Sequence, residues 1–354
     1  MATFSEVFED VTRQGRKLQT SEYKEQGKYV IIDQGQNDIA GYTNETDGLF
    51  TDVPAIVFGD HTRVLKYVDT PCFLGADGVK LLKAKIDNPN YRYLFYALSH
   101  ADIPNTGYNR HFKWLKEINI NLPSEQRQHE IVAVLDKVSD LISLRKQQLA
   151  KLDELVKSRF IELFGSVEDE NTLINLCTFI DYRGKTPEKA ESGLPFITAK
   201  NVKMHYMSFD TQEFISQETY DKVMTRGFPR IGDVVFTTEA PLGNVCRIPY
   251  IETEFYIGQR IITMQTDQLE PAYLEYALSS DEFKRKIAEK SSGSTVTGIR
   301  SKLLEQLSIP VPPRALQKQF AAFIEQVDKS KLEIQQSLDK LEILKKALMQ
   351  KYFG

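Results

Sequence analysis

Cysteine is scarce in this sequence, and its three copies, Cys72, Cys177 and Cys246, lie far apart. They form neither the close pairs that bind zinc nor a framework of disulfides. Long apolar runs are also missing, since no stretch of about 18 apolar residues occurs to span a membrane. The N-terminal residues are acidic, unlike a secretory signal. We therefore expect a cytoplasmic protein with no membrane partner.

Positive charge is not in excess either. The 354 residues carry a net charge of −4, whereas affinity for nucleic acid comes largely from Lys and Arg side chains that neutralise phosphates. Any DNA function must therefore use local basic patches or borrow affinity from a partner subunit. With 41% hydrophobic and 27% charged residues, the composition fits a globular protein, and the length fits two ordinary domains or two plus an accessory element.

The motifs of common catalytic sites are missing as well. The sequence contains no Walker loop and no Gly-rich dinucleotide fingerprint. Residues 87–91 (DNPNY) resemble a methyltransferase motif only superficially and predict a turn that caps a helix, and residues 22–24 (EYK) lack the partner motif of a nuclease. Cys246 is predicted to be a small buried hydrophobe. The histidines show no metal-ligand spacing; they are His61, His100, His111, His129 and His205. We predict no active site.

An internal repeat organises the chain. Residues 120–165 align with residues 309–354 without a gap, and both copies keep a leading proline and a closing Phe-Gly. Upstream, residues 93–99 (YLFYALS) match residues 273–279 (YLEYALS), and the second copy is longer between this short segment and the long one. Both copies also contain a strand-like run, residues 55–59 in one and 232–236 in the other. The identical pairs of the long segment are Ile120/Ile309, Pro123/Pro312, Gln128/Gln317, Ala133/Ala322, Val138/Val327, Gln147/Gln336, Leu149/Leu338, Lys151/Lys340, Leu152/Leu341, Leu155/Leu344, Lys157/Lys346, Phe164/Phe353 and Gly165/Gly354.

Each copy ends in a predicted long helix. Apolar residues recur at alternating spacings of four and three along both segments, which is the heptad pattern of a coiled coil. The prolines suit the position just before a helix, Ser124 can cap the first helix, and Gly165 and Gly354 suit the two ends. Each helix would span about 60 Å. The residues predicted to pair the helices are Leu135, Val138, Leu149, Leu152, Ile324, Val327, Leu338 and Leu341.

Charged residues interrupt both apolar stripes at positions where the other copy is apolar. Placed opposite each other in the aligned register, the stripes are complementary, which predicts that the two helices pair with each other. Two like domains joined by two like helices can close into an antiparallel, pseudo-twofold arrangement with a domain at each end. The simpler alternative is a helix pair that acts only as a spacer or dimerisation device. The aligned pairs are Arg145/Ile334, Arg159/Leu348, Ile142/Lys331 and Val156/Lys345.

Basic and polar residues cluster in Gly-containing loops of both domains, although the domains are mildly acidic as a whole. Arg and Lys in such loops suit phosphates and guanine, and Asn suits adenine; a solvated loop is the alternative for any one of them. The candidate DNA-binding residues in the first domain are Arg13, Arg16, Lys17, His61, Arg63, Tyr108, Asn109, Arg110 and Lys113. Those in the second domain are Arg183, Lys185, Lys200, Asn201, Lys203, Thr237, Thr238, Asn244, Ser294, Thr297 and Arg300.

This order of diverged domains and similar helices resembles the specificity subunit of type I restriction-modification enzymes. The likeness covers essentially the whole chain; its motifs are individually soft, and their order and duplication are specific. In the second domain, the target-recognition motifs are residues 183–187 (RGKTP), 194–202 (LPFITAKNV) and 232–243 (GDVVFTTEAPLG). The helix motifs are residues 309–313 (IPVPP) with 317–320 (QKQF), 120–124 (INLPS) with 126–128 (QRQ), and the closing 162–165 (ELFG) and 351–354 (KYFG). The first copy departs from the pattern with Leu-Pro-Ser where the second has Val-Pro-Pro.

The resemblance implies an α+β fold with two α/β target-recognition domains and two long helices in an antiparallel coiled coil. The implied segments are residues 1–122 and 166–311 for recognition, and 123–165 and 312–354 for the helices. Each domain would read one half of a split double-stranded DNA target, and the helices would set the unread spacer and dock two methyltransferase subunits. This chain would be non-catalytic and hold no cofactor. S-adenosylmethionine, ATP and magnesium would belong to the modification subunits and to restriction or translocase subunits.

Two other functions stay open at this point. A coiled-coil adaptor could use the same layout to bind a protein or carbohydrate, and it would not bind DNA even beside a methyltransferase. A fused methyltransferase-specificity protein or a nuclease would need motifs and length that the sequence lacks.

Overall fold

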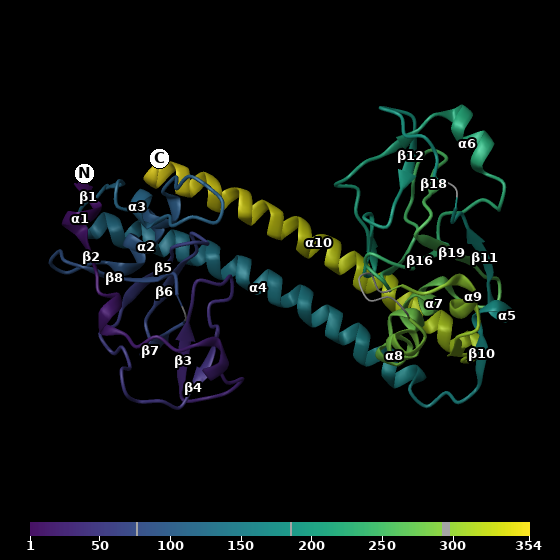
Figure 1. The fold of residues 1–354 in the computed structure, drawn as a ribbon, viewed down its shortest axis with the longest axis horizontal. Coiled ribbons are helices and arrows are strands. Elements are labelled where there is room, and N and C mark those ends of the chain that lie inside the picture. Colours follow the sequence, from purple (N-terminus) through teal and green to yellow (C-terminus); the bar gives the residue numbers. More distant parts are fainter. Residues whose placement is uncertain (76, 185, 292–297) are drawn as a thin grey trace. The chain divides into compact units, whose positions relative to one another are not determined.

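The computed structural model describes residues 1–75, 77–184, 186–291 and 298–354 (Figure 1). The chain folds into two compact units: unit 1 comprises residues 1–147 and 335–354, and unit 2 comprises residues 148–334. Each unit therefore combines one globular domain with parts of both long helices. None of the helices within the described ranges has an apolar stretch long enough to cross a membrane.

The two long helices, α4 (Glu125–Phe164) and α10 (Arg314–Phe353), start and stop at the repeated motifs. The backbone N–H of Arg127 donates to Ser124 Oγ over 3.4 Å, so Ser124 caps α4 as predicted. The repeated glutamines make the same hydrogen bond, because Gln128 and Gln317 donate from Nε2 to the carbonyls of Pro123 (3.0 Å) and Pro312 (2.8 Å). The identities in the repeat therefore preserve the helix starts.

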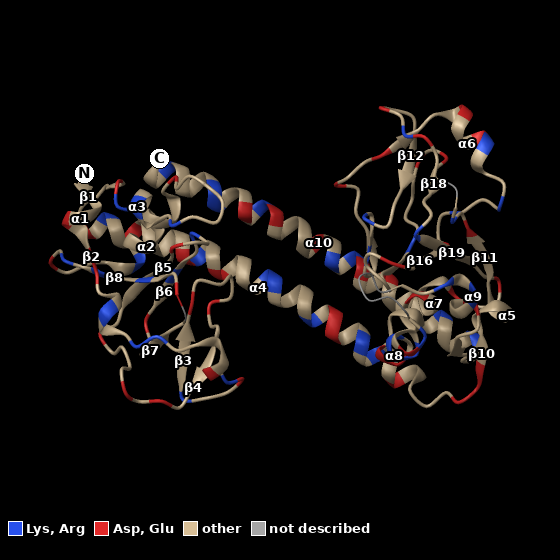
Figure 2. Ribbon diagram, in the orientation of Figure 1, with Lys and Arg blue, Asp and Glu red and all other residues tan. Residues whose placement is uncertain are grey.

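The helices run antiparallel within each unit. In unit 1, Arg145 Nε donates to Ser337 Oγ over 3.2 Å, and Lys146 pairs with Glu342 at 3.0 Å. In unit 2, Lys331 pairs with Asp153. The expectation that Lys331 lies opposite Ile142 was wrong, because the alignment compares the copies in parallel whereas the helices pair in opposite directions. Figure 2 shows acidic and basic residues interspersed along both helices.

The predicted pairing residues line the inner faces of the helices to different depths. The five that are buried are Leu135, Val138, Ile324, Val327 and Leu338. Half-buried positions are Leu149, Leu152 and Leu341. Leu135 joins the core of unit 1 beneath α2 (Tyr91–His100), and Ile324 joins the core of unit 2 beneath α7 (Pro271–Ser279). The stripe thus packs against the globular domains as well as against the partner helix.

The globular part of unit 1 is built from a four-stranded sheet, a three-stranded sheet, a two-stranded pair and short helices. Its four-stranded antiparallel sheet has the order β2 (Phe8–Asp10), β8 (Val79–Ala84), β5 (Ala55–Gly59), β6 (Leu65–Val68), and its three-stranded sheet has the order β4 (Gly41–Thr43), β3 (Tyr29–Ile32), β7 (Cys72–Leu74). Strand β1 (Ala2–Thr3) pairs with β9 (Asn119–Ile120), and the remaining helices are α1 (Phe4–Val7), α3 (Phe112–Leu115), η1 (Thr12–Gln14) and η2 (Thr20–Glu22). The predicted strand at 55–59 is confirmed: it is β5, which is buried along its whole length between β8 and β6.

Unit 2 repeats this topology. Its four-stranded sheet has the order β11 (Thr178–Asp181), β19 (Ile261–Gln265), β16 (Val234–Thr237), β17 (Val245–Arg247), and its three-stranded sheet has the order β15 (Phe214–Ile215), β12 (Leu194–Ile197), β18 (Tyr256–Ile257). Strand β10 (Glu170–Thr172) pairs with β20 (Ser308–Pro310), beside α5 (Leu173–Leu176) and α9 (Ser301–Glu305). Unit 2 adds the hairpin β13 (Val202–Lys203) with β14 (Tyr206–Met207), and α6 (Gln217–Val223). It also adds α8 (Asp281–Lys290), which lies where the second copy is longer.

The closing phenylalanine of each long helix docks on a tyrosine of a short helix. Phe353 packs on Tyr93 of α2 with ring centroids 5.3 Å apart, and Phe164 packs on Tyr273 of α7 at 4.8 Å. Each tyrosine hydroxyl also donates to a carbonyl of the segment leading into a long helix, Tyr93 to Asn121 (2.8 Å) and Tyr273 to Pro310 (2.6 Å). The helix of one repeat therefore ends against the short helix of the other repeat.

An arginine links the globular part to a long helix in each unit. In unit 1, Arg92 of α2 pairs with Asp136 of α4. In unit 2, Arg247 of β17 reaches Asp328 of α10 (3.2 Å) and the buried Glu275 of α7 (2.6 Å). These ion pairs use different strands and helices in the two units. The attachment of the globular part to the long helices therefore diverged between the repeats, whereas α4 and α10 kept the same start and end contacts.

Candidate nucleic-acid interface

Three loops of unit 2 meet at the carboxyl ends of the parallel strands β12 and β18. Gly258 N–H donates to the carbonyl of Ile197 (2.7 Å), which joins the loops after these two strands. Thr238 N–H donates to the carbonyl of Arg260 (2.9 Å), which adds the β16–β17 connection. In open sheets, ligands bind beyond the carboxyl ends of parallel strands, so this loop cluster is the candidate interface of unit 2.

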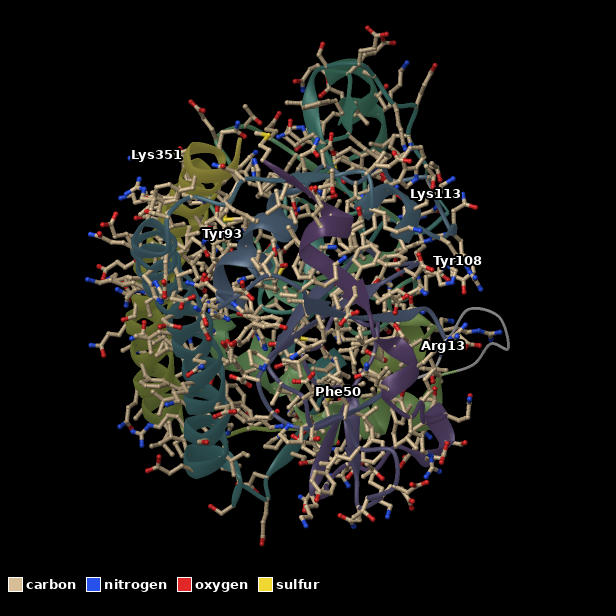
Figure 3. All side chains as sticks on the ribbon, turned by 90° about the vertical axis from the view of Figure 1, so that its left-hand side faces the viewer. Arg13, Phe50, Tyr93, Tyr108, Lys113 and Lys351 are labelled. Carbon is tan, nitrogen blue, oxygen red and sulfur yellow. The ribbon has the colours of Figure 1, made fainter. Side chains whose placement is uncertain are left out.

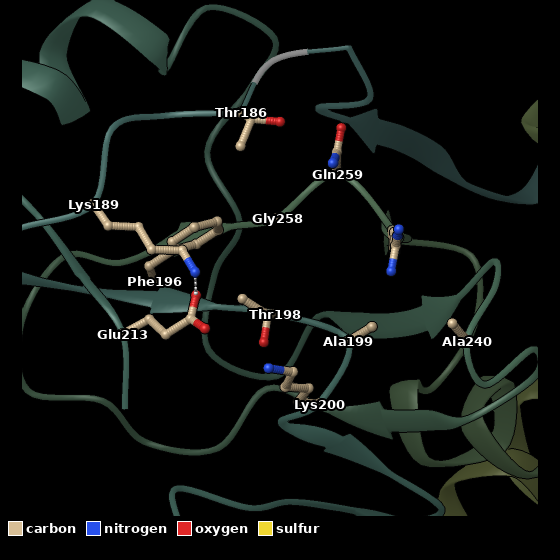
Figure 4. A pocket seen from close by; sticks show the side chains of 11 residues that line it. Thr186, Lys189, Phe196, Thr198, Ala199, Lys200, Glu213, Ala240, Gly258 and Gln259 are labelled. Carbon is tan, nitrogen blue, oxygen red and sulfur yellow. Dashed lines mark ion pairs between the residues drawn. The ribbon is translucent and has the colours of Figure 1, made fainter. Parts of the chain in front are cut away.

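A cavity of about 260 Å³ opens between these loops (Figure 4). Lys189 pairs with Glu213 at 2.8 Å across one wall, and Arg260 pairs with Glu239 at 2.9 Å beside another. Figure 4 shows Lys200 on the rim near Thr198, and Gln259 on the opposite side. Amide, hydroxyl and cationic groups in this combination can contact base edges and phosphates.

Three sequence candidates in unit 2 are buried and bonded within the protein. Asn201 is 4% exposed; its Oδ1 accepts from Thr198 N–H (2.9 Å), and its Nδ2 donates to the carbonyls of Ser208 (3.0 Å) and Thr211 (2.8 Å). Thr237 and Thr238 are also buried. Asn201 therefore shapes the loop after β12, and DNA contact by these three residues stays a prediction.

Replacing Asn201 by alanine is expected to lower the free energy of unfolding by about 1–3 kcal/mol, because it leaves buried backbone groups without partners. Thermal unfolding of the purified protein measures this loss. Lys200→Ala, at the exposed neighbouring position, is the matched control and should change stability by less than about 0.5 kcal/mol. Equal melting temperatures for the two variants would contradict the structural role of Asn201.

The other candidates of unit 2 are partly or fully accessible. Arg183 is half-buried and binds Asp181 with Nη2–Oδ2 at 2.6 Å. Burial alone would raise the pKa of Asp181, but the hydrogen bonds from Arg183 outweigh it and hold that pKa below its ordinary value. Lys203 and Asn244 are half-buried, whereas Lys200 and Arg300 are exposed. Lys185, Ser294 and Thr297 lie outside the described residues.

In unit 1, several of the predicted cations already face carboxylates. Arg16 is exposed but lies within 3.9 Å of Glu22, Glu45 and Asp47, and Lys17 lies 3.7 Å from Asp77. Arg63 is half-buried and donates to the carbonyl of Ile103 over 2.9 Å. Exposed ion pairs contribute little to stability, so phosphates can compete for Arg16 and Lys17, whereas Arg63 holds a loop.

The remaining candidates of unit 1 gather around the loop of residues 101–111. Tyr108, Asn109, Arg110 and Lys113 are exposed, and half-buried His61 of the β5–β6 connection stacks on Tyr108. Figure 3 shows Arg13, Tyr108 and Lys113 on one side of the unit, away from the end of α10 that carries Lys351. The structure therefore brings residues from three separate sequence segments onto one face.

Sequence reasoning missed the residues Lys189, Gln259 and Arg260 of the unit 2 cavity. A signal for two of them was present. Gly258, Gln259 and Arg260 interrupt an otherwise apolar run from residue 255 to 262, and a short polar break between two buried strands marks an exposed turn. Lys189 gave no signal, because its neighbour Glu213 is distant in sequence.

Neither a reactive cysteine nor a metal-binding cluster is found among residues 1–75, 77–184, 186–291 and 298–354. Burial raises the pKa of the thiols of Cys72, Cys177 and Cys246 to about 12, so all three stay protonated at neutral pH. Cys246 is fully buried, as predicted. In the same ranges, His, Cys, Asp and Glu side chains form no group that could hold a metal ion.

Comparison with known proteins identifies the family to which this repeated unit of globular domain and long helix belongs. The sequence model of the type I restriction modification DNA specificity domain matches residues 2–154 and 172–343. The chain belongs to this family. As a type I specificity subunit it serves DNA sequence recognition in a restriction-modification system, is itself non-catalytic, and assembles with other subunits of that system. The resemblance drawn from the sequence is confirmed.

Individual members of the family align with most of this chain. The specificity subunit of the type I restriction enzyme EcoR124I/EcoR124II from Escherichia coli is 24% identical over 338 residues, covering 88% of this chain and 82% of the relative. That of MjaVIII from Methanocaldococcus jannaschii is 23% identical over 319 residues, covering 78% and 74%. The crystal structure of a type I S subunit from M. genitalium matches with a TM-score of 0.62 at 18% identity, over 99% of this specificity subunit and 95% of the other chain. The predicted fold class is therefore confirmed.

Proposed function

We propose that unit 1 and unit 2 each read one half of a bipartite double-stranded DNA target, and that α4 and α10 set the unread spacer. The observation that carries the proposal is the contrast between the two parts of the repeat. The long helices keep Gln128 and Gln317, which bond the carbonyls of the leading prolines, and the docking residues Phe164 and Phe353. The candidate DNA-binding loops of the two units, in contrast, carry different residues with different ion-pair partners. Residues 1–122 and 166–311 act as readers, and residues 123–165 and 312–354 act as the frame.

We further propose that the frame docks two methyltransferase subunits, one at each repeat. Leu155 of α4 and Leu344 of α10 are identical in the alignment, and they are 49% and 45% exposed. Exposed leucines at equivalent positions of a repeat suit two copies of one partner. S-adenosylmethionine would bind in those subunits, and ATP and magnesium in a restriction or translocase subunit.

Partner subunits would also explain how a chain with a net charge of −4 can take part in DNA binding. Arg16, Lys17, Arg183 and Arg260 all lie beside carboxylates of this chain. Such paired cations contribute less counterion release than free ones. A methyltransferase bound to the frame would therefore supply much of the phosphate contact.

The test of the function is co-expression of this chain with the candidate methyltransferase, followed by methylome sequencing. We expect one bipartite methylated motif with a gap of fixed length, because two readers on one frame address two separated sites. A strain that carries the methyltransferase alone should lack the motif. Absence of new methylation in the presence of both proteins would contradict the proposal and favour a coiled-coil adaptor.

Substituting Leu155 and Leu344 by aspartate is expected to remove the methyltransferase subunits one at a time. A charge in a buried apolar contact costs about 2 kcal/mol or more, roughly a thirtyfold loss of affinity. The mass of the complex in solution should fall by one subunit for each single variant and by two for the double variant. Leu332→Asp is the control, because Leu332 is 60% exposed but aligns with Ser143. Full-mass complexes from the double variant would refute this docking site.

A further inference from the structure

Tyr108 presents an aromatic ring to solvent at the tip of the loop of residues 101–111. It is 87% exposed, more than Tyr250 (78%) or Tyr206 (60%) of unit 2. Moving a large apolar side chain out of water lowers the free energy. Contact between a partner and an exposed ring at a loop tip is therefore favourable. Figure 3 shows it projecting from the same side of unit 1 as Arg13 and Lys113.

The ring is held in place by His61. The two rings lie 4.7 Å apart and 9° from parallel, which is a stacked pair. His61 Nδ1 lies 3.2 Å from the carbonyl oxygen of Asn109; because that oxygen only accepts, Nδ1 carries the proton. The backbone N–H of His61 donates to Gln34 Oε1 over 3.2 Å. One face of Tyr108 is therefore supported, and the other is open to solvent in the part of the chain that the structure describes.

A buried pair anchors the base of this loop. His111 is fully buried; its backbone N–H donates to the carbonyl of Asp60 (2.7 Å), and its Nδ1 lies 3.0 Å from the same oxygen. Asp60 Oδ1 accepts from the N–H of Phe112 over 2.8 Å. The loop is thus fixed to the β5–β6 connection at two levels, first by Asp60 and His111 and then by His61 and Tyr108.

The same connection of unit 2 makes the equivalent attachment. There the backbone of Glu239 in the β16–β17 connection forms a β-bridge with Gly298, and Ile299 N–H donates to the carbonyl of Thr238 (3.0 Å), at the end of the longer segment between α7 and α9. Both units therefore fasten this loop to the hairpin of the central sheet. They differ in the hairpin side chain beside the attachment: His61 stacks on Tyr108 in unit 1, whereas Glu239 of unit 2 binds Arg260 at 2.9 Å. Arg110 and Lys113 flank Tyr108 and are exposed, so phosphates can lie on either side of the ring.

We propose that the Tyr108 ring is a base-contacting wedge that determines specificity in one half-site. Its free face packs on a base step of the DNA half read by unit 1, while His61 supports the other face. Apolar and aromatic wedges that enter a groove partly unstack a base step, and a ring already stacked loses little conformational entropy when it does so. His61 is a positioning residue and does not touch the DNA. This inference rests on the proposed function and adds the contact that unit 1 uses.

The experiment uses the complete complex of this chain with its methyltransferase. Methylation rates are measured on duplexes that carry each single base-pair change in the motif. Tyr108→Ala is expected to reduce discrimination about tenfold at one or two adjacent positions of one half-site and to leave the other half unchanged. Tyr108→Phe keeps the ring and should behave as wild type. Tyr250→Ala is the matched control, an exposed tyrosine of the other unit.

A second readout reports on the wedge itself. 2-Aminopurine at the affected step should become brighter when the wild-type complex binds, and Tyr108→Ala should abolish the increase. His61→Ala should weaken the signal, and His61→Phe, which restores a stacking partner, should rescue it. Full discrimination by Tyr108→Ala would overturn the proposal, and so would an equal loss in Tyr108→Phe, which would assign the contact to the hydroxyl. A wild-type complex that methylates no bipartite motif would instead overturn the proposed function.

Discussion

Removing seven residues from each long helix is expected to shorten the unread spacer by about 3 base pairs and to leave both half-site sequences unchanged. Two helical turns span about 10 Å, and successive base pairs are about 3.4 Å apart. Suitable segments are residues 145–151 of α4 and 331–337 of α10, which face each other through Arg145 and Ser337. Removing a whole heptad keeps the apolar stripes in phase.

Methylome sequencing measures this change directly. Inserting one heptad into both helices at the same places is the reciprocal variant, and it should lengthen the spacer by a similar amount. A deletion in α4 alone breaks the pairing of the two helices and should reduce assembly of the complex. An unchanged spacer in the paired deletion would show that the helices do not set the distance.

Phe164→Ala is expected to lower the free energy of unfolding of unit 2 by about 3–5 kcal/mol. Phe164 is 3% exposed and contacts three other rings, those of Phe160, Tyr273 and Phe320, with centroids 4.8–5.4 Å apart. The substitution leaves a cavity where the end of α4 meets α7 and α10. Denaturant unfolding of the complete chain, followed by circular dichroism, gives the change.

The control for Phe164 lies one turn earlier on the same helix. Ile161 is 58% exposed, and Ile161→Ala should change stability by less than about 0.5 kcal/mol. If Phe164→Ala were no more destabilising than Ile161→Ala, the closing Phe-Gly motif would have no docking role.

The frame of the molecule could be predicted from the sequence because it depends on local patterns. Heptads, leading prolines and closing glycines indicated α4 and α10, and the apolar run at 55–59 indicated β5. Residues 87–91 were expected to turn and cap a helix, and Asn90 Oδ1 does accept from the N–H of Tyr93 over 3.0 Å. Each of these features depends on residues a few positions apart.

The candidate site could be predicted only in part, because it depends on contacts between distant segments. The loop motif that contains Asn201 suggested a base reader, but once the loop folds its side chain is bonded within the protein to Thr198, Ser208 and Thr211. The stack of Tyr108 on His61 joins residues far apart in sequence. The pairing of Lys331 with Asp153 likewise follows from antiparallel packing, which the alignment of the copies does not encode.

The most direct test of two independent readers on one frame is the methylome of a hybrid chain. In this hybrid, residues 166–311 are replaced by the equivalent segment of a relative with a different mapped target, while both long helices are kept. We predict that one half of the motif changes to the relative's half, and that the other half and the spacer stay as they were. A hybrid that assembles and methylates a motif changed in both halves, or in neither, would contradict the existence of two independent readers.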